Sequence, residues 1–336
     1  MRAVVLEKFG STAEALAVRE LPDPQPKAGE VLVRLRAAAL NHRDSFIRQK
    51  LYAKIQLPAV LGSDGAGEVV HAGEGDHGGM VGRKVVIAPS HGWGGDPRAQ
   101  GKEFLILGMP EQGTFAELIA VKATRVAPMP EHLSFAEAAA LPLAGVTAYR
   151  ALVTRGGLQP GEHVLVTGIG GGVATLAQLF AQALGAQVSV TSGSEEKLAR
   201  ARSLGAIAGV SYKDPDWGKK LIEAAGRPPS LIIDGTGGEG LNALINVAAP
   251  GARIVIYGAT AGITKDLNLH KIFFKQIDLR GSTMGTDAEL HAMLGLVSRE
   301  KLRPLVDQVF KLDQAAAAMD RMDEGKQMGK IVLDLG

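Results

Sequence analysis

A glycine run near the middle of the chain carries the clearest chemistry in the sequence. Gly168-Ile169-Gly170-Gly171-Gly172-Val173 follows the short apolar run His163–Thr167 and precedes a helix-forming stretch. Glycines let a backbone turn tightly and approach a pyrophosphate, whose negative charge is attracted by the start of the following helix. A second apolar run, Gln187–Thr191, completes a strand–helix–strand unit of the length that dinucleotide sites use. We therefore predict a dinucleotide site here; a Gly-rich structural turn is the alternative.

The end of the second strand indicates which dinucleotide the site favours. An NAD site usually has an acid at this end, which holds the ribose hydroxyls. Ser192 occupies this end instead, and Glu195 and Glu196 come a turn later, where a helix N-terminus explains them. Lys197 follows and can reach back to a 2′-phosphate, although a solvated helix charge is the alternative. The sequence thus favours NADPH as the cofactor, with NADH possible.

The second half of the chain has the pattern of a sheet that would position this turn. Apolar runs alternate with helix-forming stretches, which is typical of a doubly wound parallel sheet. The six predicted strands are His163–Thr167, Gln187–Thr191, Gly209–Tyr212, Ser230–Asp234, Ala252–Tyr257 and Ile277–Ser282. Because open α/β sheets bind ligands at the carboxyl ends of their strands, we expect cofactor contacts after the fifth and sixth strands. The residues at these places are Gly258, Ala259, Ser282 and Thr283.

The first third of the chain has a different pattern. Met1–Val126 contains short segments rich in Val, Leu and Ala, separated by Pro and Gly, and reads as mostly β. Ser90–Gly113 has no such pattern and is expected to be a long irregular lobe. Two helical stretches after Pro128 are expected to bridge to the dinucleotide-binding domain. A last strand, Lys330–Leu335, is expected to rejoin the β-rich domain.

Composition excludes several classes of function. The chain has 336 residues, of which 46% are hydrophobic and 21% charged, as in ordinary globular proteins. The formal net charge of +2 is too small to argue for nucleic acid or a membrane surface. No cysteine occurs, so disulfides, thiolate catalysis and Cys-ligated zinc are excluded. No signal-peptide pattern and no long apolar run are present, which makes a cytoplasmic protein the expectation.

The order of a β-rich domain, a bridge and a late Rossmann unit resembles the medium-chain dehydrogenase/reductase superfamily. The local pieces that match are Asn41-His42-Arg43-Asp44, Leu61–Val70, Gly82–Val85, Pro142–Tyr149 and the glycine turn. The resemblance covers nearly the whole chain. It implies an α/β protein with a Rossmann doubly wound six-stranded parallel sheet over residues 126–285. It also implies a GroES-like catalytic domain over residues 1–125, completed by 286–336.

The departures from that superfamily are informative. Its zinc alcohol dehydrogenases place a Cys where this chain has Asn41 and a His-Glu pair where it has Ser63-Asp64. Their third ligand would fall near Leu143, and zinc catalysis needs three ligands of N, S or O type. The chain is therefore similar to the zinc-independent, quinone oxidoreductase-like branch, and we expect no metal. A zinc dehydrogenase of unusual ligation remains as a rival reading.

The resemblance also implies roles for particular residues. Asn41 and Tyr52 match positions near the nicotinamide, and Tyr52 can donate to a carbonyl oxygen. Thr147 matches a position that bonds near the nicotinamide ribose or ring, and Lys197 with Tyr212 match binders of the 2′-phosphate. Arg43 offers a positive charge for catalysis, although pairing with Asp44 is the alternative.

The reaction that we expect is hydride transfer. Without metal, thiol or a flavin motif, direct transfer from NADPH to a quinone or another α,β-unsaturated carbonyl is the available chemistry. An enoyl-thioester reductase and a non-catalytic NADPH-binding protein remain alternatives. We expect a small-molecule substrate and, from the resemblance, a homodimer paired through the sixth strand, Ile277–Ser282.

Overall fold

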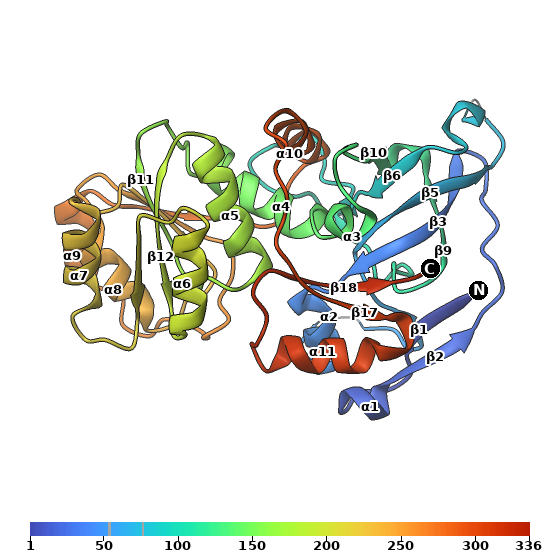
Figure 1. The fold of residues 1–336 in the computed structure, drawn as a ribbon, viewed down its shortest axis with the longest axis horizontal. Coiled ribbons are helices and arrows are strands. Elements are labelled where there is room, and N and C mark those ends of the chain that lie inside the picture. Colours follow the sequence, from blue (N-terminus) through green and yellow to red (C-terminus); the bar gives the residue numbers. More distant parts are fainter. Residues whose placement is uncertain (53–54, 76) are drawn as a thin grey trace. The chain divides into compact units, whose positions relative to one another are not determined.

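The computed structural model describes residues 1–52, 55–75 and 77–336. These residues form two compact units (Figure 1). The first unit comprises Met1–Val146 and Thr286–Gly336, and the second comprises Thr147–Gly285. The first unit therefore extends beyond the expected boundary at residue 125. The reason is that helix α3, Phe135–Ala139, packs on strands β3 and β5 of that unit.

The main sheet of the first unit is organised around strand β3. Its strands lie in the order β10-β6-β5-β3-β18-β17, and β9 also pairs with β3. Their bounds are β3 Glu30–Ala39, β5 Asp64–Ala72, β6 Lys84–Ile87, β9 Leu118–Lys122, β10 Val126–Pro128, β17 Val306–Lys311 and β18 Lys330–Asp334. Burial alternates along the first half of β3, and the second half ends in three buried alanines. Small side chains there let strands from both ends of the sequence pack on either side.

The other elements of the first unit surround this sheet. The remaining strands are β1 Arg2–Leu6, β2 Leu16–Glu20, β4 Ala59–Val60, β7 Ser90–His91 and β8 Leu105–Ile106. The helices are α1 Thr12–Ala15, α2 His42–Arg48, α10 Asp287–Arg299 and α11 Ala315–Asp323, with short 3₁₀ turns at Gly78–Met80, Ala123–Arg125 and Leu312–Gln314. Residues 90–113 are irregular apart from β7 and β8, as expected. Trp93 is buried there against the edge of Phe104.

The second unit contains the predicted parallel sheet. Its strand order is β13-β12-β11-β14-β15-β16, and all five pairings are parallel. The strands are β11 His163–Val166, β12 Gln187–Ser192, β13 Ala208–Ser211, β14 Leu231–Asp234, β15 Arg253–Ile256 and β16 Asp278–Gly281. The central strands β11 and β14 are buried along their whole length, which explains their uninterrupted apolar character. The predicted Rossmann fold is confirmed.

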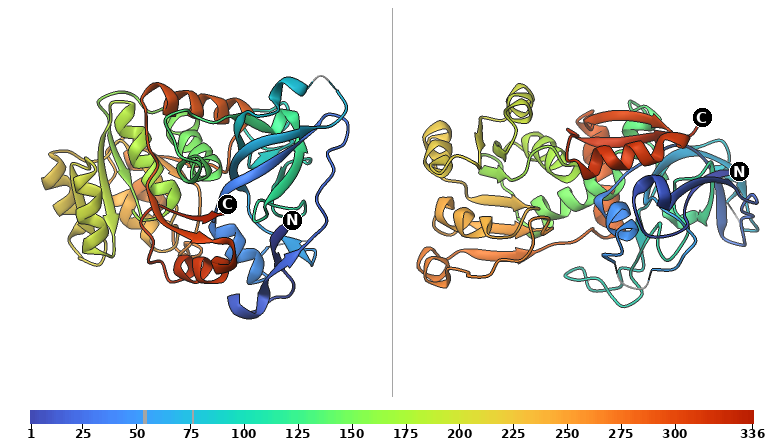
Figure 2. Two further views of the ribbon diagram at one scale, coloured as in Figure 1. Left: turned by 45° about the vertical axis from the view of Figure 1, so that its right-hand side comes forward. Right: turned by 90° about the horizontal axis from the view of Figure 1, so that it is seen from below.

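Helices cover both faces of this sheet (Figures 1 and 2). They are α5 Gly172–Ala183, α6 Glu195–Ser203, α7 Trp217–Ala225, α8 Gly240–Val247 and α9 Leu269–Lys275. Helix α4, Pro142–Tyr149, continues as a π-helical turn, Arg150–Arg155, into the first strand of the unit. Within the residues that the structure describes, no helix combines the length and apolar character needed to cross a membrane.

Candidate functional site

The glycine turn connects β11 to helix α5 in the second unit. Gly168 and Gly170 have φ of 60° and 134°, values that L side chains rarely adopt. Gly171 caps the N-terminus of α5, and the Thr175 hydroxyl donates back to the Gly171 carbonyl at 3.1 Å. The turn thus presents bare backbone and the positive end of a twelve-residue helix at one place.

The turn lies at the point where the strand order reverses. Strands β11 and β14 are neighbours, and open α/β sheets bind ligands outside the carboxyl ends of such a pair. The Thr167 hydroxyl donates to the buried Asp234 carboxylate at 2.5 Å, which ties the ends of the two strands together. Asp234 also accepts from the backbone N–H groups of Thr236 and Gly237 at 3.2 and 2.9 Å. Sequence reasoning missed Asp234, although an acid that ends an apolar run and precedes glycines was the available signal.

Two of the predicted phosphate binders lie against glycines of this edge. The Lys197 side chain crosses Gly170, since a Cβ added there would be 2.9 Å from Nζ. The Tyr212 ring covers Gly193, where an added Cβ would be 2.5 Å from the hydroxyl. Ser192, at the end of β12, is buried and its hydroxyl accepts from the Ser194 N–H at 3.2 Å. The Lys197 ammonium and the Tyr212 phenol therefore lie near the end of β12, where an NAD site would have an acidic side chain.

The other predicted cofactor residues lie in the loops after β15 and β16 and in helix α4. Gly258 and Ala259 follow β15, and Ser282 and Thr283 follow β16, at the same edge of the parallel sheet. The described residues offer no hydrogen-bond partner to the buried Ser282 hydroxyl. Thr147 is buried in α4. Bare turn backbone, a helix N-terminus and a nearby ammonium fit a phosphorylated dinucleotide well.

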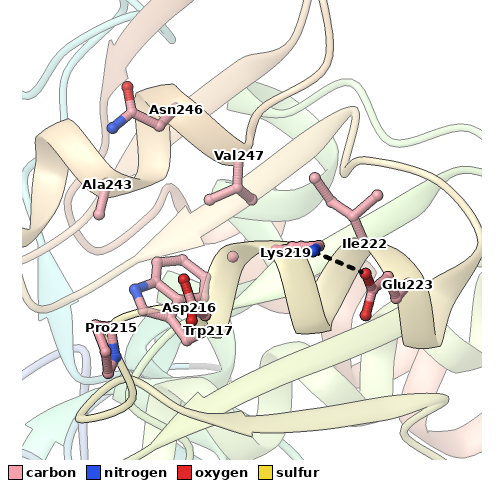
Figure 3. A pocket seen from close by; sticks show the side chains of 10 residues that line it. Pro215, Asp216, Trp217, Lys219, Ile222, Glu223, Ala243, Asn246 and Val247 are labelled. Carbon is pink, nitrogen blue, oxygen red and sulfur yellow. Dashed lines mark ion pairs between the residues drawn. The ribbon is translucent and has the colours of Figure 1, made fainter.

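Away from the glycine turn, the surface of the same unit has a hollow of about 440 Å³ (Figure 3). Residues of α7 and α8 line it, including Trp217 and Asn246. Lys219 and Glu223 of its rim form an ion pair with each other at 3.8 Å, one helical turn apart. The polar groups of the rim are thus partly engaged with each other, and we assign the hollow no function.

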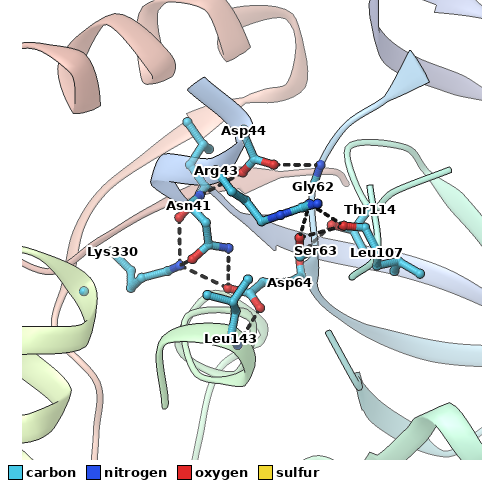
Figure 4. A network of polar contacts seen from close by, with 12 residues as sticks. Asn41, Arg43, Asp44, Gly62, Ser63, Asp64, Leu107, Thr114, Leu143 and Lys330 are labelled. Atoms are coloured by element: carbon cyan, nitrogen blue, oxygen red, sulfur yellow. Dashed lines mark hydrogen bonds and ion pairs between the residues drawn. The ribbon is translucent and has the colours of Figure 1, made fainter. Parts of the chain in front are cut away.

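A buried polar network occupies the first unit, where three strands meet (Figure 4). Strand β5 begins with Asp64 opposite Ala39, the last residue of β3. Strand β18 begins with Lys330. The carbonyl of its second residue, Ile331, accepts from the Leu40 N–H at 3.0 Å. The C-terminal end of β3 therefore lies between the first residues of β5 and the first residues of β18. This topology brings Lys330 beside residues about 290 positions away in the sequence.

Lys330, Asn41 and Asp64 form the centre of the network. The Lys330 ammonium donates to Asn41 Oδ1 at 2.6 Å, to the Leu40 carbonyl at 2.7 Å and to Asp64 Oδ2 at 3.0 Å. Asp64 Oδ2 also accepts from Asn41 Nδ2 at 2.9 Å, and Oδ1 accepts from the Leu143 N–H at 2.7 Å. Every one of these contacts is within the first unit. Sequence reasoning assigned Lys330 no role; a lysine directly before the apolar run Ile331–Leu333 was the available signal.

Arg43 belongs to a neighbouring part of the network. Its Nη1 donates to Ser63 Oγ at 2.9 Å and to the Leu107 carbonyl at 2.6 Å, and the Tyr52 ring lies 5.5 Å from the guanidinium. Within the described residues Arg43 forms no ion pair with Asp44, but its charge acts to lower the pKa of the Asp44 carboxyl, so an electrostatic pairing of the two stays an alternative. Arg43 is buried and anchors the irregular lobe. Tyr52 is 40% exposed.

Asp44 is fully buried at the start of helix α2. It accepts from the Asn41 N–H at 2.8 Å and from the Gly62 N–H at 3.3 Å. Burial raises the pKa of the Asp44 carboxyl to about 6, while the Arg43 charge and these bonds act in the opposite direction. Burial thus moves the pKa of this carboxyl toward neutral pH.

Comparison with known proteins identifies the family. Residues 27–131 match the model of the alcohol dehydrogenase GroES-like domain, and residues 172–299 match that of the zinc-binding dehydrogenases. The zinc-type alcohol dehydrogenase-like protein YogA of Leptosphaeria maculans is 40% identical over 98% of this chain and 97% of its own length. The chain belongs to the medium-chain dehydrogenase/reductase superfamily. It is an oxidoreductase of that type, and the expected GroES-like domain is confirmed.

Two further members are similar over their full lengths. Acryloyl-coenzyme A reductase of Metallosphaera sedula is 31% identical over 99% of both chains. A crystal structure described as an NAD-dependent alcohol dehydrogenase has a TM-score of 0.93 and 39% identity, and each chain is covered completely.

The family name implies zinc, and the donor groups of this chain do not fit it. Zinc takes three or four ligands from thiolate, imidazole and carboxylate. Within the described part of the chain, no group of three His, Cys, Asp or Glu side chains could hold a metal ion. Asn41 is bound to Lys330 and Ser63 to Arg43, and Leu143 has an apolar side chain that cannot bind a metal. Lys330 and Arg43 thus place positive charges against Asn41 and Ser63, two of the positions at which the resemblance implied zinc ligands.

Proposed function

We propose that this protein is an NADPH-dependent reductase of quinones and other α,β-unsaturated carbonyl compounds that works without a metal. The observation that carries the proposal is the ammonium of Lys330, held by Asn41 and Asp64 at the expected metal position. Alcohol and unactivated ketone chemistry depends on a Lewis acid in this superfamily. A conjugated acceptor spreads the developing negative charge over several atoms, so hydrogen-bond donors suffice.

The proposed cofactor is NADPH, held by the second unit. The reduced nicotinamide of such a cofactor supplies a hydride. Backbone N–H groups at the start of α5 would bind the pyrophosphate, and Lys197 with Tyr212 would bind the 2′-phosphate. A relative's crystal structure is described as NAD-dependent, so cofactor choice is a point on which this chain would differ.

Residues of the first unit would serve the acceptor. Asn41 is 8% exposed and carries an amide N–H that can donate to a carbonyl oxygen. Tyr52 offers a hydroxyl and is 40% exposed. Arg43 is bound to Ser63 and Leu107, so its proposed contribution is the position of the Tyr52 ring rather than direct contact.

The second candidate is an enoyl-thioester reductase. The relative that favours it is the acryloyl-coenzyme A reductase of Metallosphaera sedula, at 31% identity. Both candidates transfer a hydride to an acceptor that is conjugated with a carbonyl group; a quinone becomes a hydroquinone, whereas an enal or enoyl thioester has its C=C bond saturated. A non-catalytic NADPH-binding protein is the third reading.

The decisive experiment is NADPH oxidation with a panel of quinones, enals and enoyl thioesters. We expect turnover with at least one conjugated class and none with saturated ketones. Activity should survive chelators, and purified protein should contain no stoichiometric zinc. Turnover of simple alcohols that requires zinc would overturn the proposal, and binding of NADPH without any turnover would favour the non-catalytic reading.

Lys197 gives the test of cofactor choice. We expect Lys197→Ala to weaken NADPH binding roughly tenfold or more, since a charge-assisted bond to phosphate contributes about 1.5–3 kcal/mol. NADH binding should not change. Lys219→Ala on α7 is the matched control, because that lysine is an exposed helix charge. Equal use of both cofactors by the unchanged protein would remove NADPH from the proposal.

We propose that two copies of this chain pair through strand β16. This strand is the edge of the parallel sheet, and an unpaired edge invites pairing with another chain. Helix α9 just before it has no buried residue and exposes Leu269, Phe273 and Phe274. A second copy would cover both features. Light scattering should give the mass of a dimer, and Phe273→Glu with Phe274→Glu should give a monomer; a monomeric wild type would contradict the pairing.

A further inference from the structure

The Lys330–Asp64 pair is unusually deeply buried. The Lys330 side chain is 4% exposed and that of Asp64 is 0% exposed. Removing two charges from water is costly, and replacing such pairs by apolar residues is often neutral or stabilising. Stability alone therefore does not explain why this chain keeps an ammonium in the middle of a polar network. Its geometry suggests a more specific role.

The contacts of the Lys330 ammonium exclude direct contact with a substrate and indicate that it positions another side chain. A lysine ammonium has three N–H groups, and three oxygens accept from Lys330, those of Leu40, Asn41 and Asp64. No N–H group is therefore left to protonate or bind a substrate. The ammonium instead resembles a coordinated cation, surrounded by a carbonyl, an amide oxygen and a carboxylate. Lys330 is thus a positioning residue.

The group that it positions is the Asn41 carboxamide. Because Oδ1 accepts from Lys330, Nδ2 must point the other way, where it donates to Asp64. The bond to Asp64 uses one of the two N–H groups of Nδ2. The second N–H is the one that Asn41 can offer to a substrate oxygen. Without the ammonium, Oδ1 loses this donor and only the bond from Nδ2 to Asp64 still orients the amide.

We propose that Lys330 is the resident cation of this centre: its ammonium takes the place of a metal ion, fixes the orientation of Asn41 and prevents zinc from binding. The donors that hold it are hard oxygens with a single negative charge among them, which suits an ammonium and not zinc. The chain can therefore match the zinc-binding dehydrogenase model while its own donor groups do not fit zinc. The role of the cation does not depend on which acceptor the enzyme reduces.

Chemical rescue tests the cation directly. Lys330→Ala leaves the Asp64 carboxylate buried without its counter-charge, although Asn41 and the Leu143 N–H still donate to it, so we expect the Tm of the variant to fall by roughly 5–15 °C. Propylammonium, at about 100 mM, replaces the missing part of the side chain and should restore at least half of the lost Tm. Tetramethylammonium chloride at the same concentration carries the charge without N–H groups and should restore nothing. This readout needs no substrate, so it stands or fails independently of the proposed activity.

Lys311→Ala is the matched control. Lys311 lies on the neighbouring strand β17 and pairs with Asp334 at 2.5 Å, but its side chain is 71% exposed. We expect no change in Tm and no response to propylammonium in this variant. An equal loss of Tm in both variants, or a Lys330→Ala variant that melts like wild type or ignores propylammonium, would overturn the proposal.

A neutral double variant covers the case in which Lys330→Ala does not fold. Lys330→Met with Asp64→Asn removes both charges, so we expect it to fold with a Tm close to that of wild type. Its Asn41 amide is no longer fixed, and kcat should fall roughly tenfold or more while KM changes little. A folded double variant with the kcat of wild type would show that Lys330 is merely structural, and so would overturn the proposal.

Discussion

The two polar centres of this molecule are built in opposite ways. In the second unit, the glycine turn, the strand before it and the helix after it are consecutive in sequence, and the bare backbone is the functional group. In the first unit, the centre uses side chains from the N-cap of α2 just after β3, from the start of β5 and from the start of β18. The first kind of site is a local property of the chain, whereas the second exists only when the whole sheet has formed.

This difference predicts different consequences of mutation. A local site can be damaged while the fold survives, because its residues do little besides meet the ligand. A site assembled from distant strands shares its contacts with the fold, so most changes in it also change stability. The four predictions below test that distinction, beginning with the largest expected effect.

Gly329→Ala should be the most damaging. Gly329 has a φ of +106° and leads into Lys330, and an added Cβ would lie 2.1 Å from the Leu305 carbonyl oxygen. Strain and a forced backbone shift together should cost about 3–5 kcal/mol of unfolding free energy. Denaturant titration measures this loss. Gly325→Ala is the matched control, since its φ is +65° with open space around the Cβ; a loss as large there would show that strain alone is responsible.

Asp44 should make the stability of the protein depend on pH. Its folded pKa of about 6 lies above the ordinary value of 3.8, so between these values the folded chain holds a proton that the unfolded chain has released. The unfolding free energy should therefore fall as pH rises from 4 to 6 and level off above that, by up to about 3 kcal/mol for a shift of this size. The contribution is complete at low pH and lost at neutral pH.

Asp44→Asn should remove this dependence. An amide has no proton to exchange in this range, so the difference between wild type and variant, measured by denaturant titration from pH 4 to 7, isolates the one group. Asp334→Asn is the control, because the bond from Lys311 lowers the pKa of Asp334, and its contribution changes only below pH 4. Parallel curves for wild type and Asp44→Asn would contradict the assignment.

Sequence reasoning succeeded where information was local. Gly168–Val173, the six strands and the family followed from consecutive patterns, and the structure confirms the fold. The missing zinc ligands at Asn41 and Ser63 were visible because the family's motif fixes those positions. Lys330 was not foreseeable, because only the antiparallel pairing of β18 with β3 brings it to Asn41. The contact of Arg43 with the irregular lobe was not foreseeable for a similar reason, because the Leu107 carbonyl that accepts from it lies 64 positions away in the sequence.

Arg43→Met should have an intermediate effect on stability. The guanidinium donates to Ser63 and to the Leu107 carbonyl, and charge-assisted bonds of this kind contribute about 1.5–3 kcal/mol. We expect a loss of about 2 kcal/mol and faster proteolysis within residues 90–113. Arg98→Met in the same lobe is the control, because that side chain is 84% exposed and its loss should leave stability unchanged. Proteolysis at the wild-type rate in Arg43→Met would show that Arg43 does not anchor the lobe.

Gly170→Ala should separate function from fold in the second unit. Its φ of +134° disfavours any side chain, and an added Cβ would meet Lys197 at 2.8–2.9 Å, which pushes the ammonium out of place. Cofactor affinity should fall tenfold or more, about 1.4 kcal/mol, as measured by fluorescence titration with NADPH. Gly161→Ala is the control, since it has the same kind of positive φ, +81°, with open space at the opposite end of β11. Equal losses of affinity in both variants would mean that strain transmitted through the sheet, and not the turn itself, governs cofactor binding. If only Gly170→Ala loses affinity while the two variants lose similar stability, the turn is a local site that the fold carries without depending on it.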